Sequence, residues 1–210
     1  MRARKNNSKK LTVVLLSIIL VLCCTIGGTL AWLTAESETV TNTFTVGNIT
    51  IELKEHELKT DGTLDASKEV SENENYKVVP GDTQPKDPFV RVKQGSEKCY
   101  VYVLVTNNLV IDNKAVATCN IYNNWEAIGT KDNSTLYRSN AIVDAGTSDQ
   151  LVQVFSTVSY DGTEITETNI NSLKDKTIVI DAYAHQSENT TQDVADAAAK
   201  AHFGITDSTT

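Results

Sequence analysis

Histidine chemistry is the first possibility that the sequence raises, because the chain has three histidines: His56, His185 and His202. A zinc protease of the common type needs two histidines one helical turn apart, with a glutamate as general base. The segment His56-Glu57 begins like that motif, but Thr60 stands where the second histidine is required. His185 and His202 are too far apart in sequence to supply it. We therefore interpret all three as surface histidines and expect no metal site.

Other catalytic signatures do not stand out in the sequence. It has no Gly-x-Ser-x-Gly nucleophile elbow and no glycine-rich phosphate loop. The acidic pairs Glu55 with Glu57 and Asp61 with Asp65 are most simply a solvated loop, and their spacing is not that of a calcium-binding EF-hand loop. We expect no catalytic residues, no cofactor and no enzymatic activity.

Thiol chemistry is confined to four cysteines. Cys23 and Cys24 lie inside a long apolar run near the N-terminus and act there as apolar filler. Cys99 and Cys119 lie in the body of the chain. In an exported protein two such cysteines can form a disulfide, or they can remain as two buried thiols, and the sequence leaves both alternatives open.

The N-terminus has the pattern of a secretory signal peptide over residues 1–31. The first ten residues carry five basic side chains and no acid, and Leu11–Ile26 is a predominantly apolar run without any charged residue. This run is shorter than the roughly 20 residues of a membrane-spanning helix. Small residues follow, which predicts cleavage between Ala31 and Trp32, with cleavage after Ala35 as the alternative. The cleaved protein would have no stable membrane anchor.

The charge of the chain limits its partners. The formal net charge is −8, and removal of a leader with five basic residues and no acid leaves −13. So acidic a protein is poorly suited to nucleic acid or to an anionic membrane surface. Residues 32–210 are long enough for one domain with a sizeable core. Any self-association must use apolar and backbone contacts that outweigh repulsion between like subunits.

Strand patterning begins almost directly after the predicted cleavage site. Val40, Asn42, Phe44 and Val46 fall on one face of an extended segment, and threonines alternate with them on the other face. Gly47-Asn48 then predicts a turn or bulge. The mature N-terminus, residues 32–46, is therefore expected to be a strand.

The rest of the chain predicts many short strands and one helix. Residues 99–106 are apolar on both faces, which indicates a central strand, whereas residues 54–77 are polar and predict a long loop with at most a weak hairpin around Asp61-Gly62. Pro80-Gly81 suits a type II turn.

A helix capped at Thr190-Thr191 and ended by Gly204 would present Val194, Ala197, Ala198 and Ala201 as its apolar stripe. Further strands are expected near residues 49–53, 89–93, 116–122, 125–128, 136–138, 151–158 and 177–184. This is the pattern of an all-β sandwich with one short C-terminal helix.

Several short motifs resemble the TasA/camelysin family of Gram-positive exported proteins, whose signal peptides are cut by the signal peptidase SipW. They are Gly28–Ala31 followed by Trp32, then Asn42–Leu53, Val79–Asp82, Lys86–Pro88, Gly95–Val103 and Thr177–Gln186. The resemblance implies a jelly-roll-type sandwich and a secreted, extracellular location at the cell surface or in a matrix.

The same resemblance implies a structural role in biofilm fibres. In that family the N-terminal strand of one subunit completes a sheet of the next, which here makes residues 32–46 the donor strand and Val40, Phe44 and Val46 its interface. The partners would be a SipW-type signal peptidase and further copies of the chain or a sister fibre subunit. Two alternatives remain. One is a monomeric accessory module of such a fibre. The other is a camelysin-like secreted metalloprotease, which is disfavoured because the sequence lacks the pair of histidines that would bind zinc.

Overall fold

A computed structural model describes residues 16, 48–73 and 76–205. By its internal contacts the chain divides into two units, residues 1–45 and 46–210, and all the described strands belong to the second. The expected cleavage site at Ala31 and the expected donor strand, with Val40, Phe44 and Val46, lie outside the described residues. Both stay predictions.

The described strands, in chain order, are short and separated by turns, as the composition predicts. They are β1 Ile51–Leu58, β2 Leu64–Val70, β3 Thr83–Pro85, β4 Phe89–Val92, β5 Cys99–Asn107, β6 Val110–Ile111, β7 Lys114–Ala115, β8 Ala117–Ile121, β9 Trp125–Lys131, β10 Ser134–Ser139, β11 Gln150–Gln153, β12 Phe155–Tyr160 and β13 Ile178–Gln186. A 3-10 turn, η1 Ile170–Leu173, precedes β13, and helix α2, Gln192–Phe203, follows it.

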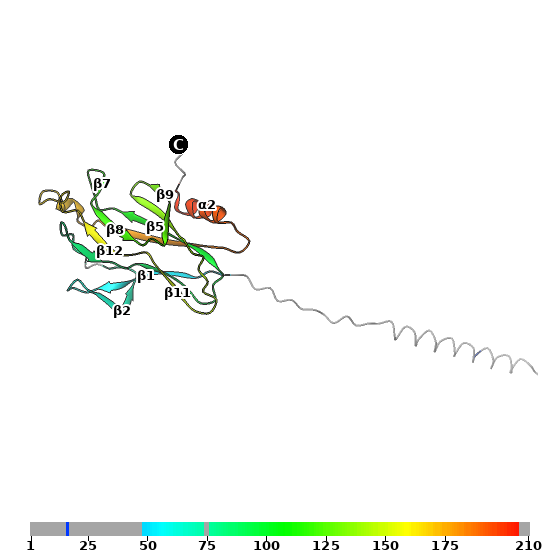
Figure 1. Cartoon of the computed structure of the whole chain (residues 1–210). Helices are drawn as coiled ribbons and strands as arrows, with labels where there is room; N and C mark the ends of the chain where they lie inside the picture. Colours follow the sequence, from blue (N-terminus) through cyan, green and yellow to red (C-terminus); the bar gives the residue numbers. More distant parts are fainter. Residues whose placement is uncertain (1–15, 17–47, 74–75, 206–210) are drawn as a thin grey trace, which may run out of the picture. The chain divides into compact units, whose positions relative to one another are not determined.

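The strands form antiparallel sheets around one apolar core (Figure 1). One sheet has the order β11-β4-β1-β2 and a second has the order β13-β5-β10-β9. A three-stranded sheet, β3-β12-β8, and the small β6-β7 pair complete the described body. The expectation of a mostly β fold with one C-terminal helix is confirmed.

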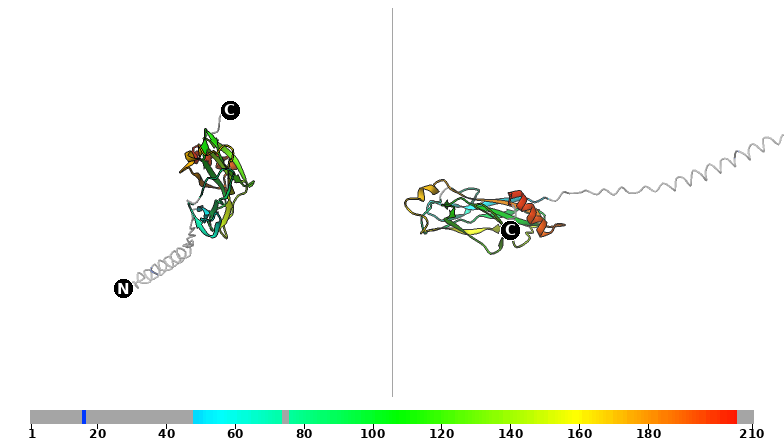
Figure 2. Two further views of the ribbon diagram at one scale, coloured as in Figure 1. Left: turned by 90° about the vertical axis from the view of Figure 1, so that its left-hand side faces the viewer. Right: turned by 90° about the horizontal axis from the view of Figure 1, so that it is seen from above.

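Strand β5 is central, as its two apolar faces predict. It pairs with β13 on one side and β10 on the other. Cys99, Val101 and Val103 are buried toward the main core, and Tyr102 is buried on the other face, where α2 covers the sheet (Figure 2). A strand covered on both faces needs apolar residues at every position, which explains why the period-2 alternation of a half-exposed strand is absent.

Helix α2 has the predicted ends but presents a different face to the sheet. The Thr191 side chain accepts a hydrogen bond from the Val194 N–H, and Gly204 ends the helix at φ 65°. The buried residues, however, are Ala195 and Ala199, whereas Val194 is 58% exposed. The predicted stripe was wrong by about one position, because five of the twelve residues of α2 are alanines and the sequence alone does not say which of them meets the sheet.

The polar segment 54–77 is more ordered than predicted. Strand β1 continues to Leu58 and pairs with β2 through a tight turn at Asp61-Gly62, where Gly62 has φ 84°. The expected turn at Asp61-Gly62 and hairpin form, and the expectation was wrong only in describing the segment mainly as a loop, since backbone pairing organises this hairpin although most of its side chains are polar. The turn at Pro80-Gly81 forms as predicted, with Gly81 at φ 77°.

A second departure concerns the segment 151–158, which sequence patterning predicts as one strand. The structure divides it into β11 and β12, which belong to different sheets. At the break, the Val154 N–H donates to the Pro88 carbonyl and the Val154 carbonyl accepts from the Tyr122 N–H. One residue thus connects two sheets, an arrangement that side-chain alternation does not reveal.

A buried ionic network fastens α2 to the sheet. The Arg138 guanidinium, 6% exposed, pairs with Asp196 of α2 and with Glu126 of β9. The Tyr102 hydroxyl donates to the same Asp196 carboxylate at 2.9 Å. Asp196 therefore satisfies two buried donors at once, and its loss would leave both without that partner.

We expect Asp196→Ala to lower the free energy of unfolding by about 2–4 kcal/mol, because it removes one of the two carboxylates that pair with the buried Arg138 guanidinium and the acceptor of the buried Tyr102 hydroxyl. Asp193→Ala, one turn earlier on the exposed side of the helix, serves as the control and should cost at most about 1 kcal/mol. Urea unfolding followed by circular dichroism measures both. Equal small losses would contradict the fastening role of Asp196.

Candidate binding groove between two open strand edges

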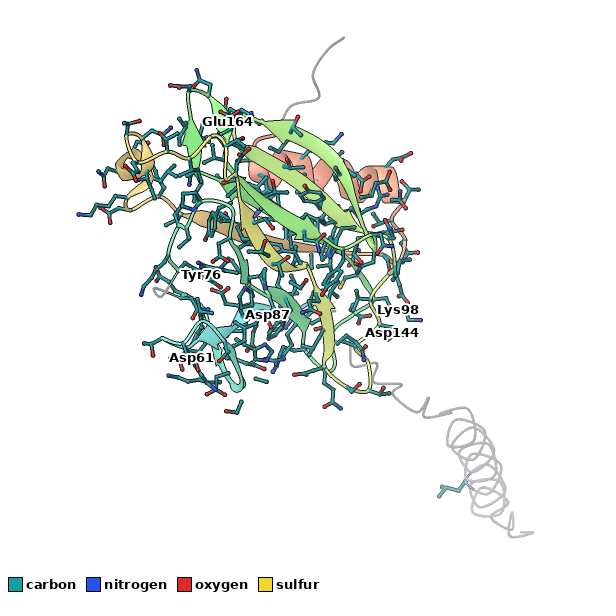
Figure 3. All side chains as sticks on the ribbon, turned by 60° about the vertical axis from the view of Figure 1, so that its left-hand side comes forward. Asp61, Tyr76, Asp87, Lys98, Asp144 and Glu164 are labelled. Carbon is teal, nitrogen blue, oxygen red and sulfur yellow. The ribbon has the colours of Figure 1, made fainter. Side chains whose placement is uncertain are left out.

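A groove of about 780 Å³ lies between β1 and the segment that leads from η1 into β13. Its lining is mixed, with charged and polar residues beside ten apolar ones: Leu53, Val78, Pro88, Leu109, Val158, Ile170, Leu173, Ile178, Val179 and Ile180. Figure 3 shows Tyr76, which also lines the groove, and Asp87 above the hairpin that carries Asp61. The volume of the groove falls within the range of ligand-binding clefts.

One wall of the groove is the open edge of β13. Among the described strands β13 pairs with β5 alone. The Thr177 carbonyl and the Ser187 N–H, at its two ends, bond toward the β5 side. Because backbone groups alternate in direction along a strand, those of Ile178, Ile180 and Ala182 point toward the open edge.

The opposite wall has a second open edge, on β1. The Thr50 carbonyl accepts from the Lys93 N–H on the β4 side, so the backbone groups of Ile51 and Leu53 point away from β4. Strand β2 covers this edge only from Glu55 onward. Strand β13 lies close to β1 but does not pair with it in the described structure. The groove is thus bordered by two strand edges whose outward backbone groups pair with no other described strand.

The floor of the groove contains a buried polar cluster. Glu55 and Lys86 are 6% and 8% exposed, and the Lys86 ammonium lies 2.6 Å from the Glu55 carboxylate. The ammonium also lies 4.8 Å from the centre of the Tyr76 ring, a cation–π distance. Glu55, expected from sequence to be solvated, is therefore a buried ion-pair partner.

The Tyr76 hydroxyl is the unusual member of this cluster. Its oxygen is buried, and the Glu55 carboxylate lies within reach of it as an acceptor, although the angles among the described residues are poor for a hydrogen bond. Burial, and then the nearby Glu55 carboxylate, raise the pKa of the Tyr76 phenol well above its ordinary value. It stays a neutral hydroxyl, able both to donate and to accept a hydrogen bond.

His56 is not the free surface histidine that the sequence suggested. Its Nδ1 lies 2.6 Å from the Asp87 carboxylate, which also accepts a hydrogen bond from the His56 backbone N–H. The ring is partly covered, with Phe89 packed beside it. This pairing ties β1 to the segment before β4, directly behind the groove.

The other two histidines lie on the opposite side of the second sheet. His202 stacks on Tyr183 with ring centres 4.6 Å apart, and His185 lies near the same tyrosine. Within residues 48–73 and 76–205, no three histidine, cysteine or acidic side chains come together in a way that could hold a metal ion.

Cys99 and Cys119 are both free in the structure. Cys99 begins β5, whereas Cys119 lines a hollow with Val105 and Asn107, near the other end of that strand. Six residues of strand separate Cys99 from Val105, or about 20 Å, while a disulfide needs Cα atoms within about 7 Å. Burial raises the pKa of each thiol to about 11. Of the two alternatives left by the sequence, the structure shows two separate thiols.

Comparison with known proteins adds no family to this description: no family model, curated protein or solved structure matches the chain. No helix among the described residues is long and apolar enough to cross a membrane.

Sequence reasoning did not single out Tyr76, Lys86 or the edge of β13 as functional. The alternation Ile178, Ile180, Ala182 was visible, but it signals only a strand with one apolar face. Nothing in the sequence says that β13 has a neighbour on one side only. The groove therefore became visible only when the order of the strands was known.

We expect Glu55→Gln to lower the free energy of unfolding by about 3–5 kcal/mol, because it leaves the buried Lys86 ammonium without its counter-ion. Glu57→Gln is the matched control, since its partner Lys68 is largely exposed, and it should cost at most about 1 kcal/mol. Urea titration of the two variants checks this difference. Similar midpoints would show that the ion pair in the groove floor does not stabilise the fold.

Proposed function

We propose that this protein is a secreted structural subunit that polymerises into extracellular matrix or biofilm fibres by strand addition, with the groove between β1 and β13 receiving the N-terminal strand of the next copy. The observation that carries the proposal is that two open strand edges border one apolar groove. Such a site offers an extended peptide both backbone hydrogen bonds and pockets for alternate side chains.

An empty groove leaves strand edges unpaired and apolar surface exposed to water. Open edges attract other strands and are normally covered, charged or shortened. Here the edge of β13 is nine residues long and is bordered by Ile178 and Ile180. Insertion of a strand would pair these backbone groups and remove apolar surface from water, at roughly 25 cal/mol per Å². Contacts of this kind can outweigh the repulsion between acidic subunits.

The segment 32–46 suits this groove in length and pattern. Fifteen extended residues span about 50 Å, which is enough to leave one subunit and enter another. Val40, Phe44 and Val46 share a face and can act as knobs against the apolar lining. Glu36 and Glu38 precede them, and the groove is bordered by charges of both signs, Lys54, Lys174 and Lys176 with Glu72 and Asp175, so the fit rests on the apolar face.

Head-to-tail insertion gives a filament rather than a closed oligomer. The donor and the acceptor are different surfaces of one subunit, so each added copy presents a new groove or a new strand. The signal-peptide pattern and the motifs that resemble TasA/camelysin proteins support export and a jelly-roll-type sandwich. Removal of the leader after Ala31 would free the donor strand, so that processing controls assembly.

The first test compares two purified proteins, one that starts at Trp32 and one that starts at Gly47. We expect filaments by negative-stain electron microscopy from the longer protein only, because the shorter one lacks the donor. Compact monomers from both would reject self-polymerisation and would favour the accessory module, which binds a sister subunit without assembling by itself.

A second test alters the acceptor. Ile178→Lys places a charge in the groove, so we expect it to abolish filaments while the monomer keeps its circular dichroism spectrum. Val194→Lys makes the same chemical change on the exposed face of α2 and should leave filament formation unchanged. Filaments from both variants, measured by sedimentation and microscopy, would rule out this groove as the acceptor.

A further inference from the structure

The hollow that contains Cys119 is a second candidate site, separate from the groove. Its volume is about 380 Å³, within the range of small-ligand pockets. It shares no lining residue with the groove between β1 and β13. Its floor is apolar, because Val105 and Ala117 are 7% and 4% exposed, and half-buried Tyr137 lines it beside them. The hollow therefore offers a ligand an apolar surface that is partly withdrawn from solvent.

Two tight turns form the rim of this hollow. The β6–β7 turn carries Asn113 at φ 62°, and the β9–β10 turn carries Asp132 at φ 51° and then Asn133. Asparagine and aspartate tolerate this left-handed backbone, which explains their use in such turns. The Asn107 backbone N–H donates to the Asn133 carbonyl, and its side-chain amide donates to the Ala117 carbonyl at 2.7 Å. The rim is thus fixed to the end of β5 and the start of β8.

The rim supplies hydrogen-bonding groups that the subunit itself does not use. Within residues 48–73 and 76–205, four side chains of the lining make no hydrogen bond or ion pair with another residue: Asn113, Thr118, Asp132 and Asn133. They come from the two turns and from β8, and all are exposed. Convergence of free polar groups over an apolar floor is the pattern of a ligand-binding pocket.

The charge of the rim selects the class of ligand. Among the described residues that line the hollow there is no lysine or arginine, and Asp132 is the only carboxylate. A phosphate, a nucleic acid or an acidic polymer would find no counter-charge there and would meet a protein of net negative charge. A calcium ion requires more oxygen ligands than one carboxylate provides. The hollow therefore suits a neutral ligand.

A neutral sugar matches the groups of this hollow. Each sugar hydroxyl both donates and accepts hydrogen bonds, an asparagine amide does the same, and a carboxylate accepts. The C–H groups on one face of a sugar ring gain from contact with an apolar floor. We propose that the hollow binds a neutral carbohydrate, whose hydroxyls bond to Asn113, Asp132 and Asn133 while its ring lies on the floor at Ala117 and Tyr137.

This proposal goes beyond fibre assembly and does not depend on it, because the hollow and the groove share no residue. The partner would be a neutral polysaccharide outside the cell. In a filament the same hollow would recur on every subunit, so that weak binding at each copy would add up to firm attachment.

The experiment uses the mature chain starting at Trp32 and a panel of neutral oligosaccharides of glucose, galactose, mannose and N-acetylglucosamine. Oligogalacturonate serves as the charged comparison. Saturation-transfer NMR detects binding and gives the Kd whether the chain is monomeric or assembled. We expect at least one neutral oligosaccharide to bind, and oligogalacturonate to give no signal.

Two substitutions then locate the site. Asp132→Gly and Asn113→Gly remove rim side chains without backbone strain, because glycine adopts positive φ freely. Each should weaken binding about tenfold, since hydrogen bonds to the ligand are lost. The matched controls Asp112→Gly and Asn189→Gly also replace residues at positive φ, 49° and 56°, but these do not line the hollow and should leave the Kd unchanged.

The failures of the two proposals are distinguishable. Absence of binding by every neutral member of the panel at millimolar concentration would overturn the carbohydrate proposal, as would a preference for oligogalacturonate. Binding that both rim substitutions leave unchanged would place the sugar elsewhere and reject this hollow. If the chain forms no filaments, the proposed function fails while the sugar binding is still expected.

Discussion

The backbone hydrogen-bond requirement of the β-strand is the constraint on which this structure depends. Strand β5 meets that requirement on both sides, through β13 and β10, and the core forms around it. Strand β13 meets it on one side only within the described residues, and β1 is uncovered where β2 does not reach. These open edges are where the body can gain free energy from another strand, so the location of the groove follows from the incomplete pairing.

The composition of the groove adds specificity to that general attraction. Backbone pairing and apolar contact accept many strands of similar pattern, whereas a surface that also holds polar groups accepts fewer. The Lys86 ammonium pairs with the Glu55 carboxylate and lies over the Tyr76 ring. The polar cluster in the floor is thus held together by contacts within the subunit.

Local signals in the sequence predicted much of the fold. The continuous apolar run from Cys99 identified β5 as central, and the Thr191 and Gly204 signals located α2, because capping and burial on both faces are local properties. The prediction was wrong for features that depend on which elements pack or pair with one another. Sequence did not show that Ala195 and Ala199 would be the buried alanines of α2, or that Val154 would divide one strand into β11 and β12.

Sequence by itself determined the charge, the signal-peptide pattern, the strand-rich body and the alternating face of residues 32–46, since each depends on residue type and short-range spacing. Only the tertiary structure decided that β1 and β13 border one groove, that Lys86 lies against Glu55, and that the Tyr76 ring lies against the Lys86 ammonium. These residues are distant along the chain, and strand order brings them together. Periodicity specifies which face of a strand is apolar, whereas an open edge is a property of the whole sheet.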